Sequence, residues 1–109
     1  MNEDLVISGS GDNLIKIWDK RSEKEEHSLK DHKSGILSLD MDLDNYRIIS
    51  GSNDATINIW DTRRLTSPLR KLIAHSLGVF ALKSDYFSII SGSADKSVKV
   101  IIFSHFFFY

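Results

Sequence analysis

The chain has no cysteine among its 109 residues, a single proline, and 14 basic against 15 acidic side chains. Without cysteine it can form neither a disulfide framework nor a thiolate zinc site. The balanced charge gives no overall field toward nucleic acid or an anionic membrane, so we expect neither as a partner. With 41% hydrophobic and 27% charged residues, the composition is that of one globular domain.

Signals for export and for metal binding are also missing. Residues 1–12 read MNEDLVISGSGD and lack the basic region and apolar stretch of a secretory signal. No Asn-x-Ser/Thr sequon occurs, and His27 and His105 have no ligating neighbours at metal-site spacing. We therefore expect a cytoplasmic or nuclear protein without a metal or other cofactor.

One twelve-residue pattern occurs three times. It reads SGSGDNLIKIWD at 8–19, SGSNDATINIWD at 50–61 and SGSADKSVKVII at 91–102. Gly9, Gly51 and Gly92 lie 42 and 41 residues apart, and a fixed period near 40 indicates stacked supersecondary units.

Inside each unit, apolar residues alternate with polar ones, which favours strands joined by hairpins over helices. The middle unit predicts a four-stranded antiparallel meander with strands at 35–42, 46–51, 56–61 and 69–75. Before it we expect two strands and the segment EHSLKDH, and after it VFALKSD, FSIISG and SVKVIIF. No linker divides the chain.

A period of about 40, four short strands per unit and a Trp-Asp pair that closes the third strand resemble the WD-repeat family, whose fold is the β-propeller. The resemblance implies an all-β fold of antiparallel four-stranded blades, here an incomplete propeller. We assign residues 1–100 to this partial propeller, with repeat cores near 5–19, 35–61 and 79–100.

The resemblance also implies a buried hydrogen-bonded tetrad. A His before the first strand, a Ser on the second, an Asp in the next turn and a Trp on the third form this tetrad in the family. One complete set is expected here, made of His32, Ser50, Asp54 and Trp60. Partial sets are expected in the other units, namely Ser8, Asp12 and Trp18, and then His75, Ser91 and Asp95, with Ile101 in the Trp position.

Serine, histidine and aspartate together also suggest a hydrolase triad, in which a base and an orienting acid activate a nucleophile. Yet the set recurs at least in part in every unit, whereas a catalytic site is needed once. A Trp donor suits a chain of buried hydrogen bonds. The structural interpretation is therefore preferred, and no enzyme activity is expected.

Partner binding in the family usually occurs on the face with the loops before the first strand and between the second and third. By resemblance, this face presents Gly35, Leu37 and Asn53 from one unit and Gly78, Phe80 and Ala94 from the next. Apolar Leu37 and Phe80 would form anchors for a protein partner. The alternative is that both side chains only cap the local core.

Both Trp-Asp pairs are followed by arginine at the same offset, Arg21 and Arg63. Trp-Asp-x-Arg is similar to the submotif by which some WD-repeat proteins dock as substrate receptors on the adaptor of a cullin-RING ubiquitin ligase. The resemblance thus implies a protein-binding scaffold, with a ubiquitin-ligase receptor or adaptor as its sharper form. The cations Arg63, Arg64, Arg70 and Lys71 could contact phosphate, although a solvated loop and strand edge is the simpler interpretation.

The third copy departs from the pattern at residue 101. Residues 101–109 read IIFSHFFFY, and five of the nine Phe and Tyr residues lie in the final seven positions. We interpret this segment as a tail foreign to the repeat and prone to aggregation. A closed propeller needs about four to eight blades, so the others would come from a longer chain or an oligomer. A truncated, non-functional product is the alternative.

Overall fold

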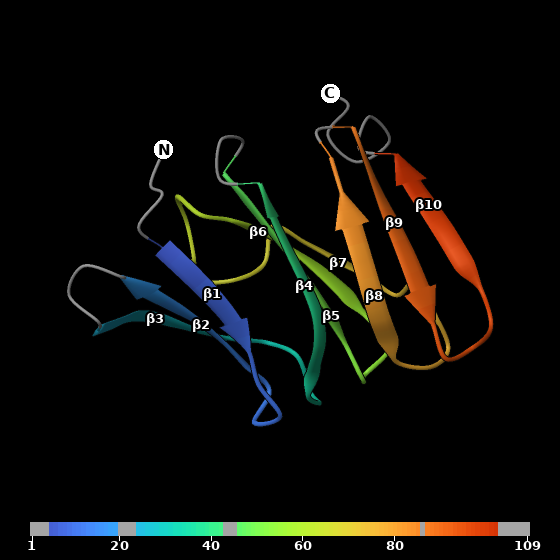
Figure 1. Cartoon of the computed structure of the whole chain (residues 1–109), viewed down its shortest axis with the longest axis horizontal. Coiled ribbons are helices and arrows are strands. Elements are labelled where there is room, and N and C mark those ends of the chain that lie inside the picture. Colours follow the sequence, from blue (N-terminus) through green and yellow to red (C-terminus); the bar gives the residue numbers. More distant parts are fainter. Residues whose placement is uncertain (1–4, 20–23, 43–45, 86, 103–109) are drawn as a thin grey trace.

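The computed structural model describes residues 5–19, 24–42, 46–85 and 87–102, and within them it forms ten β-strands in three antiparallel sheets (Figure 1). We call the sheets blades 1 to 3. Blade 1 contains β1 (Leu5–Gly9), β2 (Leu14–Asp19) and β3 (Lys24–Lys30). Blade 2 contains β4 (Ile36–Asp42), β5 (Arg47–Ser52), β6 (Ile57–Asp61) and β7 (Arg70–Leu72). Blade 3 contains β8 (Val79–Ser84), β9 (Ser88–Ser93) and β10 (Val98–Ile102).

The expected all-β fold and the four-stranded meander of the middle unit are confirmed, with strand order β4-β5-β6-β7. The last strand extends further than the assigned repeat. Ile101 pairs with Ile89 and Ile102 with Ser88, and Ile101 packs against the core between blades 2 and 3. Two residues assigned to the foreign tail therefore lie within blade 3, because the antiparallel pairing of β10 with β9 continues through them. Residues 103–109 lie outside the described residues.

Three equivalent turns, between β1 and β2, between β5 and β6 and between β9 and β10, share one backbone geometry. Asn13, Ala55 and Lys96 occupy the left-handed region with φ of 74°, 74° and 72°. The preceding aspartate accepts a hydrogen bond from the backbone N–H two residues ahead of it, at 3.2, 2.9 and 2.9 Å in the three turns. This bond helps to offset the cost of a left-handed backbone at a residue with a side chain.

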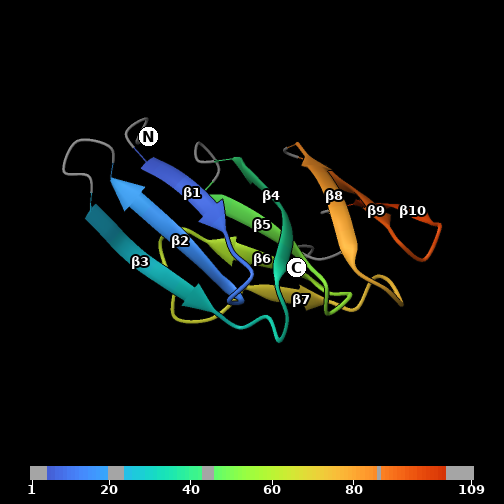
Figure 2. The ribbon, with the colours of Figure 1, turned by 60° about the horizontal axis from the view of Figure 1, so that its bottom comes forward.

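The three blades are arranged as a fan, with blades 1 and 3 at its ends (Figure 2). We call the side of a blade that faces the preceding blade its front face, and the side that faces the following blade its back face. The back face of blade 1 and the front face of blade 2 share a core that includes Ile15, Ile17, Leu29, Ile48 and Trp60. The back face of blade 2 and the front face of blade 3 share a second core that includes Ile49, Ile57, Ile59, Val79 and Ile89. The core thus lies between the blades.

A glycine near the end of β1 and of β5 lets the first strand of the next blade approach. A Cβ on Gly51 would lie 2.8 Å from Val79 Cγ1, and one on Gly9 would lie 2.8 Å from Ile36 Cβ. Gly92 is the equivalent residue of blade 3, and a Cβ there would lie 3.7 Å from its nearest neighbour. The same glycine is therefore required sterically in two blades only.

This difference predicts that Gly51→Ala destabilises the chain while Gly92→Ala does not. Overpacking at Gly51 should lower the free energy of unfolding by about 1 to 3 kcal/mol. At Gly92 the lower backbone entropy of alanine in the unfolded chain should leave stability unchanged or slightly higher. Urea denaturation followed by tryptophan fluorescence measures both.

Equal destabilisation by the two substitutions would contradict this packing. A broad, non-cooperative transition of the unsubstituted chain would instead favour the hypothesis of a truncated product without a stable fold.

Candidate functional site

Four residues form a hydrogen-bonded chain in blade 2. The indole N–H of Trp60 on β6 donates to Ser50 Oγ on β5, at 3.1 Å. Ser50 Oγ lies 2.7 Å from Nε2 of His32, which precedes β4. His32 Nδ1 lies 3.1 Å from Oδ2 of Asp54 in the turn between β5 and β6. The structure thus brings together the complete set named from the sequence.

The protonation states of His32 and Asp54 determine which group donates and which accepts in each hydrogen bond of this tetrad. Burial lowers the pKa of His32, and the charge of Asp54 opposes this only in part. Burial alone would raise the pKa of Asp54, but hydrogen bonds from Thr56 and from the backbone N–H of Lys33 lower it to about 2. Ionised Asp54 can only accept, so Nδ1 of neutral His32 donates to it. His32 Nε2 then accepts from the Ser50 hydroxyl, which itself accepts from Trp60.

Blades 1 and 3 contain partial versions of this hydrogen-bonded tetrad. In blade 3, Ser91 Oγ and Asp95 Oδ2 each lie 2.9 Å from a ring nitrogen of His75, while Ile101 in the Trp position has no polar group to donate. In blade 1, Trp18 Nε1 donates to Ser8 Oγ at 3.1 Å. Asp12 accepts from the backbone N–H of Leu14 within its own turn.

A hydroxyl two residues after the turn aspartate is a further member that the sequence interpretation did not include. Thr56 Oγ1 lies 3.1 Å from His32 Nδ1, and Ser97 Oγ lies 3.0 Å from His75 Nδ1. The signal was present in the sequence, because Asp-x-Thr and Asp-x-Ser occur at matching positions in the second and third units.

The order of these bonds is that of a Ser-His-Asp triad, but the environment is not that of a nucleophile. Ser50 and Ser91 have no exposed surface, so a substrate carbonyl has no approach to either hydroxyl. Ser50 Oγ is also engaged by Trp60. The arrangement therefore serves to tie two strands, a turn and the preceding loop together.

The described part of the chain has neither a cluster of metal ligands nor a membrane-spanning helix. There, no three His, Cys, Asp or Glu side chains are grouped so that they could hold a metal ion. The same residues include no helix of the length and apolarity required to cross a membrane.

Two exposed apolar side chains, Leu37 on β4 and Phe80 on β8, lie at equivalent positions of blades 2 and 3. The pairing of β4 with β5 shifts register between Ile36 and Ser38, and that of β8 with β9 shifts between Val79 and Ala81. Leu37 and Phe80 lie at these irregularities, with 47% and 57% of their surface exposed. A β-bulge redirects a side chain in this way. Both residues lie on the surface and in neither core cluster.

Hydrogen bonds fix the loops beside these two residues, along the lower edge of the view in Figure 1. The N–H of Asn53 donates to the carbonyl of Gly35 at 2.9 Å, and that of Ala94 to Gly78 at 3.1 Å. A Cβ on Gly78 would lie 2.9 Å from Asn53 Oδ1 and 3.0 Å from Leu37 Cδ1. Because Gly78 has no side chain, Asn53 and Leu37 can lie against blade 3. Exposed Leu77 extends this face, and the sequence interpretation had not named it.

The arginine of the second Trp-Asp-x-Arg segment is held in place. Arg63 Nε and one terminal nitrogen each lie 3.0 Å from an Asp61 carboxylate oxygen, and the guanidinium lies 4.3 Å from the ring centroid of Tyr46. The role of Tyr46 was missed, since 17 positions separate it from Arg63 in the sequence. Arg21 lies outside the described residues.

The cations considered for phosphate binding do not form a free cluster. Lys71 Nζ lies 2.6 Å from Asp31 Oδ2, and Arg63 is paired with Asp61. Arg64 and Arg70 are exposed. At least two of the four cations are thus partly neutralised, which agrees with a solvated loop and strand edge.

The tetrad geometry predicts that Ser50→Ala is more destabilising than Ser91→Ala. Ser50→Ala removes the acceptor of Trp60 and the donor to His32, whereas Ser91→Ala removes only the partner of His75. Unsatisfied buried groups cost roughly 1 to 3 kcal/mol each, so the Ser50 variant should lose about twice as much. Chemical denaturation of both variants checks this. Equal losses would show that the Trp60 bond contributes nothing.

Comparison with known proteins agrees with this architecture. The family model described as WD domain, G-beta repeat matches residues 2–19, 23–61 and 66–101. Among curated proteins, no match was found. Among solved structures, the crystal structure of the computationally designed Ika8 protein is similar, with a TM-score of 0.82 and 31% identity over 94% of this chain.

The chain spans 31% of the length of the Ika8 chain, so the likeness covers a part of that structure. The family matches cover most of the chain. The first two include the patterns at 8–19 and 50–61, and the third includes all but the last residue of the pattern at 91–102. Apart from Ile102 at the end of β10, the blades, the turns and the tetrad lie within them. The chain belongs to the WD-repeat family.

Proposed function

We propose that the chain is a non-catalytic scaffold that binds a segment of a protein partner across Leu37 and Phe80. Repeats of the WD family imply a protein-interaction scaffold. The observation that carries the specific proposal is that β4 and β8 each have a β-bulge at the same position. Each bulge exposes an apolar side chain, and the two blades are adjacent. One exposed leucine needs no explanation, but a repeated exposure at a bulge favours a binding role.

The surroundings of the two side chains suit this role. Asn53 is exposed beside Leu37, and its backbone is tied to Gly35. The Ser93 hydroxyl donates to the carbonyl of Leu77, which fixes the matching loop of blade 3. A face whose loops are already ordered loses little entropy on binding. Apolar anchors with a polar rim are typical of the energetically dominant part of an interface.

Selection from a displayed peptide library, with the purified chain as bait, tests this proposal. Peptides that bind the parent chain should bind the Leu37→Asp and Phe80→Asp variants about tenfold or more weakly, because each substitution places a charge where the peptide would cover an apolar side chain. Leu69→Asp is the matched control, since Leu69 is a similarly exposed leucine outside this face. Binding that survives both substitutions would overturn the proposal, provided the variants keep the thermal transition of the parent chain.

A sharper form of the proposal is a substrate receptor that docks on the adaptor of a cullin-RING ubiquitin ligase through Arg63. The support is that Arg63 is two-thirds exposed, yet oriented by Asp61 and Tyr46. An arginine in this state has donors left for a partner, because only part of its guanidinium is engaged. Arg21 would be its counterpart in blade 1. For such a role we propose a cytoplasmic or nuclear location.

The docking role predicts that Arg63→Lys weakens binding to a purified ligase adaptor about tenfold, because lysine keeps the charge but loses the planar multi-donor contact. Arg64→Lys, next to it on the same exposed loop, should have little effect. Biolayer interferometry with the immobilised adaptor measures both. Undiminished capture after replacing both Arg21 and Arg63 with alanine would rule out this form and leave the scaffold proposal intact.

A further inference from the structure

The loop between β6 and β7 contains a serine that is followed by proline. Residues 66–71 read TSPLRK, and Pro68 is the only proline of the chain. Ser67 is therefore the only serine or threonine of the sequence with proline after it, and Arg70 lies three positions further along. Because proline has no backbone N–H, this pair fits an enzyme site that is apolar where the next residue of its substrate binds.

The Ser67 side chain is accessible. It is exposed, and its hydroxyl forms no hydrogen bond with any residue in the part of the chain that the structure describes. The hydroxyls of Ser50 and Ser52, in contrast, are fully buried and hydrogen-bonded. Ser67 thus differs from the serines of the strands, because an enzyme can approach its hydroxyl without opening a core.

The residues after Ser67 are extended and lie at the edge of blade 2. The N–H of Leu69 donates to the carbonyl of Ile59 at 2.8 Å, and β7 follows as a strand of three residues that pairs with β6 at the end of the described sheet. Leu65 packs against the core between blades 1 and 2 and holds the start of the loop. So short an edge strand separates from its sheet at low cost, so an enzyme can bind the residues after the serine as an extended segment.

Two arginines lie on either side of Ser67, three positions before it and three after it. Arg64 forms a bridge to Asp61 of β6, and Arg70 pairs with Ile59 of the same strand. Since Asp61 and Ile59 are two positions apart, at about 3.4 Å per residue, the backbones of the two arginines lie about 7 Å apart along β6. Both side chains are exposed, and Ser67 lies in the span of chain that joins them.

The other charges of this loop favour a negative group on Ser67. Residues 62–71 contain four cations and no acidic residue. Of the carboxylates beside the loop, Asp61 is paired with Arg63 and Asp31 with Lys71. A phosphate on Ser67 would add about two negative charges at neutral pH, and it would meet arginines rather than unpaired carboxylates.

We propose that Ser67 is a phosphorylation site for a proline-directed serine/threonine kinase, and that Arg64 and Arg70 hold the phosphate once it is attached. Ser67 Oγ attacks the γ-phosphorus of Mg²⁺-bound ATP, a new O–P bond forms, and the bond to the leaving ADP oxygen breaks. The hydroxyl proton passes to the carboxylate base of the kinase. The three phosphate oxygens then accept hydrogen bonds from the guanidinium groups, whose geometry suits them. This inference depends on neither the Leu37 and Phe80 face nor docking through Arg63.

Incubation of the full chain with a purified proline-directed kinase, Mg²⁺ and ATP tests the site. Intact mass spectrometry should show one phosphate on the parent chain and on Thr66→Ala, and none on Ser67→Ala. Arg70→Ala should lower kcat/KM about tenfold, as expected for one lost charge-assisted contact to the kinase. Arg64→Ala, an exposed arginine at the same distance before the serine, should leave it unchanged. An unmodified parent chain, or a phosphate that persists on Ser67→Ala, would overturn the proposal.

A ³¹P NMR titration of the phosphorylated chain tests the contact with the arginines. The second pKa of phosphoserine is about 6, and the guanidinium groups should lower it by about half a unit or more, because they stabilise the dianion. Arg64→Ala should return this pKa toward its value in concentrated urea. Lys33→Ala removes an exposed cation at the opposite end of blade 2 and should not change it. Equal pKa values in the folded and the urea-unfolded chain would contradict the role of Arg64 and Arg70.

Discussion

The structure depends on the packing of one blade's back face against the next blade's front face. A three- or four-stranded sheet of this size has two apolar faces and cannot bury either by itself. The two core clusters of the chain both lie between blades, and neither lies within a single sheet. Stability is then a sum of terms from neighbouring blades, as in other repeat proteins. Among the described residues, the middle blade takes part in both of these cores, and blades 1 and 3 take part in one each.

The polar tetrad is joined to this packing through one residue. Trp60 donates to Ser50 and also belongs to the core shared with blade 1, so the packing that buries the indole also shields the hydrogen bonds beside it. Blade 3 shows that the two roles can separate. Ile101 fills the Trp position and packs against the core of blades 2 and 3, while His75, Ser91 and Asp95 keep their bonds without an indole donor. Apolar contact at this position thus suffices to dock a blade.

Much of this architecture could be predicted from the sequence because it is encoded locally. Period-two alternation and the repeated Gly-Ser turns specified the strands, and the family resemblance identified the partners of His32. The bulges at Leu37 and Phe80 could not be foreseen as bulges, because a register shift depends on how two strands pair rather than on either strand alone. The left-handed backbone at Ala55 and Lys96 was equally hidden, since glycine or asparagine is the usual residue there. The resemblance still placed Leu37 and Phe80 on the exposed face.

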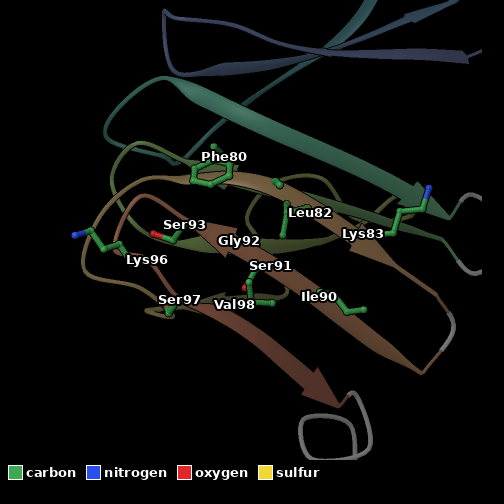
Figure 3. Close-up of a pocket in the computed structure, with 11 residues that line it drawn as sticks. Phe80, Leu82, Lys83, Ile90, Ser91, Gly92, Ser93, Lys96, Ser97 and Val98 are labelled. Atoms are coloured by element: carbon green, nitrogen blue, oxygen red, sulfur yellow. The ribbon is translucent and has the colours of Figure 1, made fainter.

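The two exposed anchors have different surroundings, and this difference follows from the packing of blades. Leu37 in blade 2 lies against Gly78 of blade 3, which limits the positions open to its side chain. Phe80 in blade 3 has no following blade in the described part of the chain and borders a hollow around Gly92 instead (Figure 3). In the proposed binding role, Leu37 would therefore be the more fixed anchor and would lose little rotamer entropy on binding, whereas Phe80 would have more side-chain freedom to lose. A contact that filled the hollow beside Phe80 would remove part of that freedom, and would thereby influence the proposed binding at the loops.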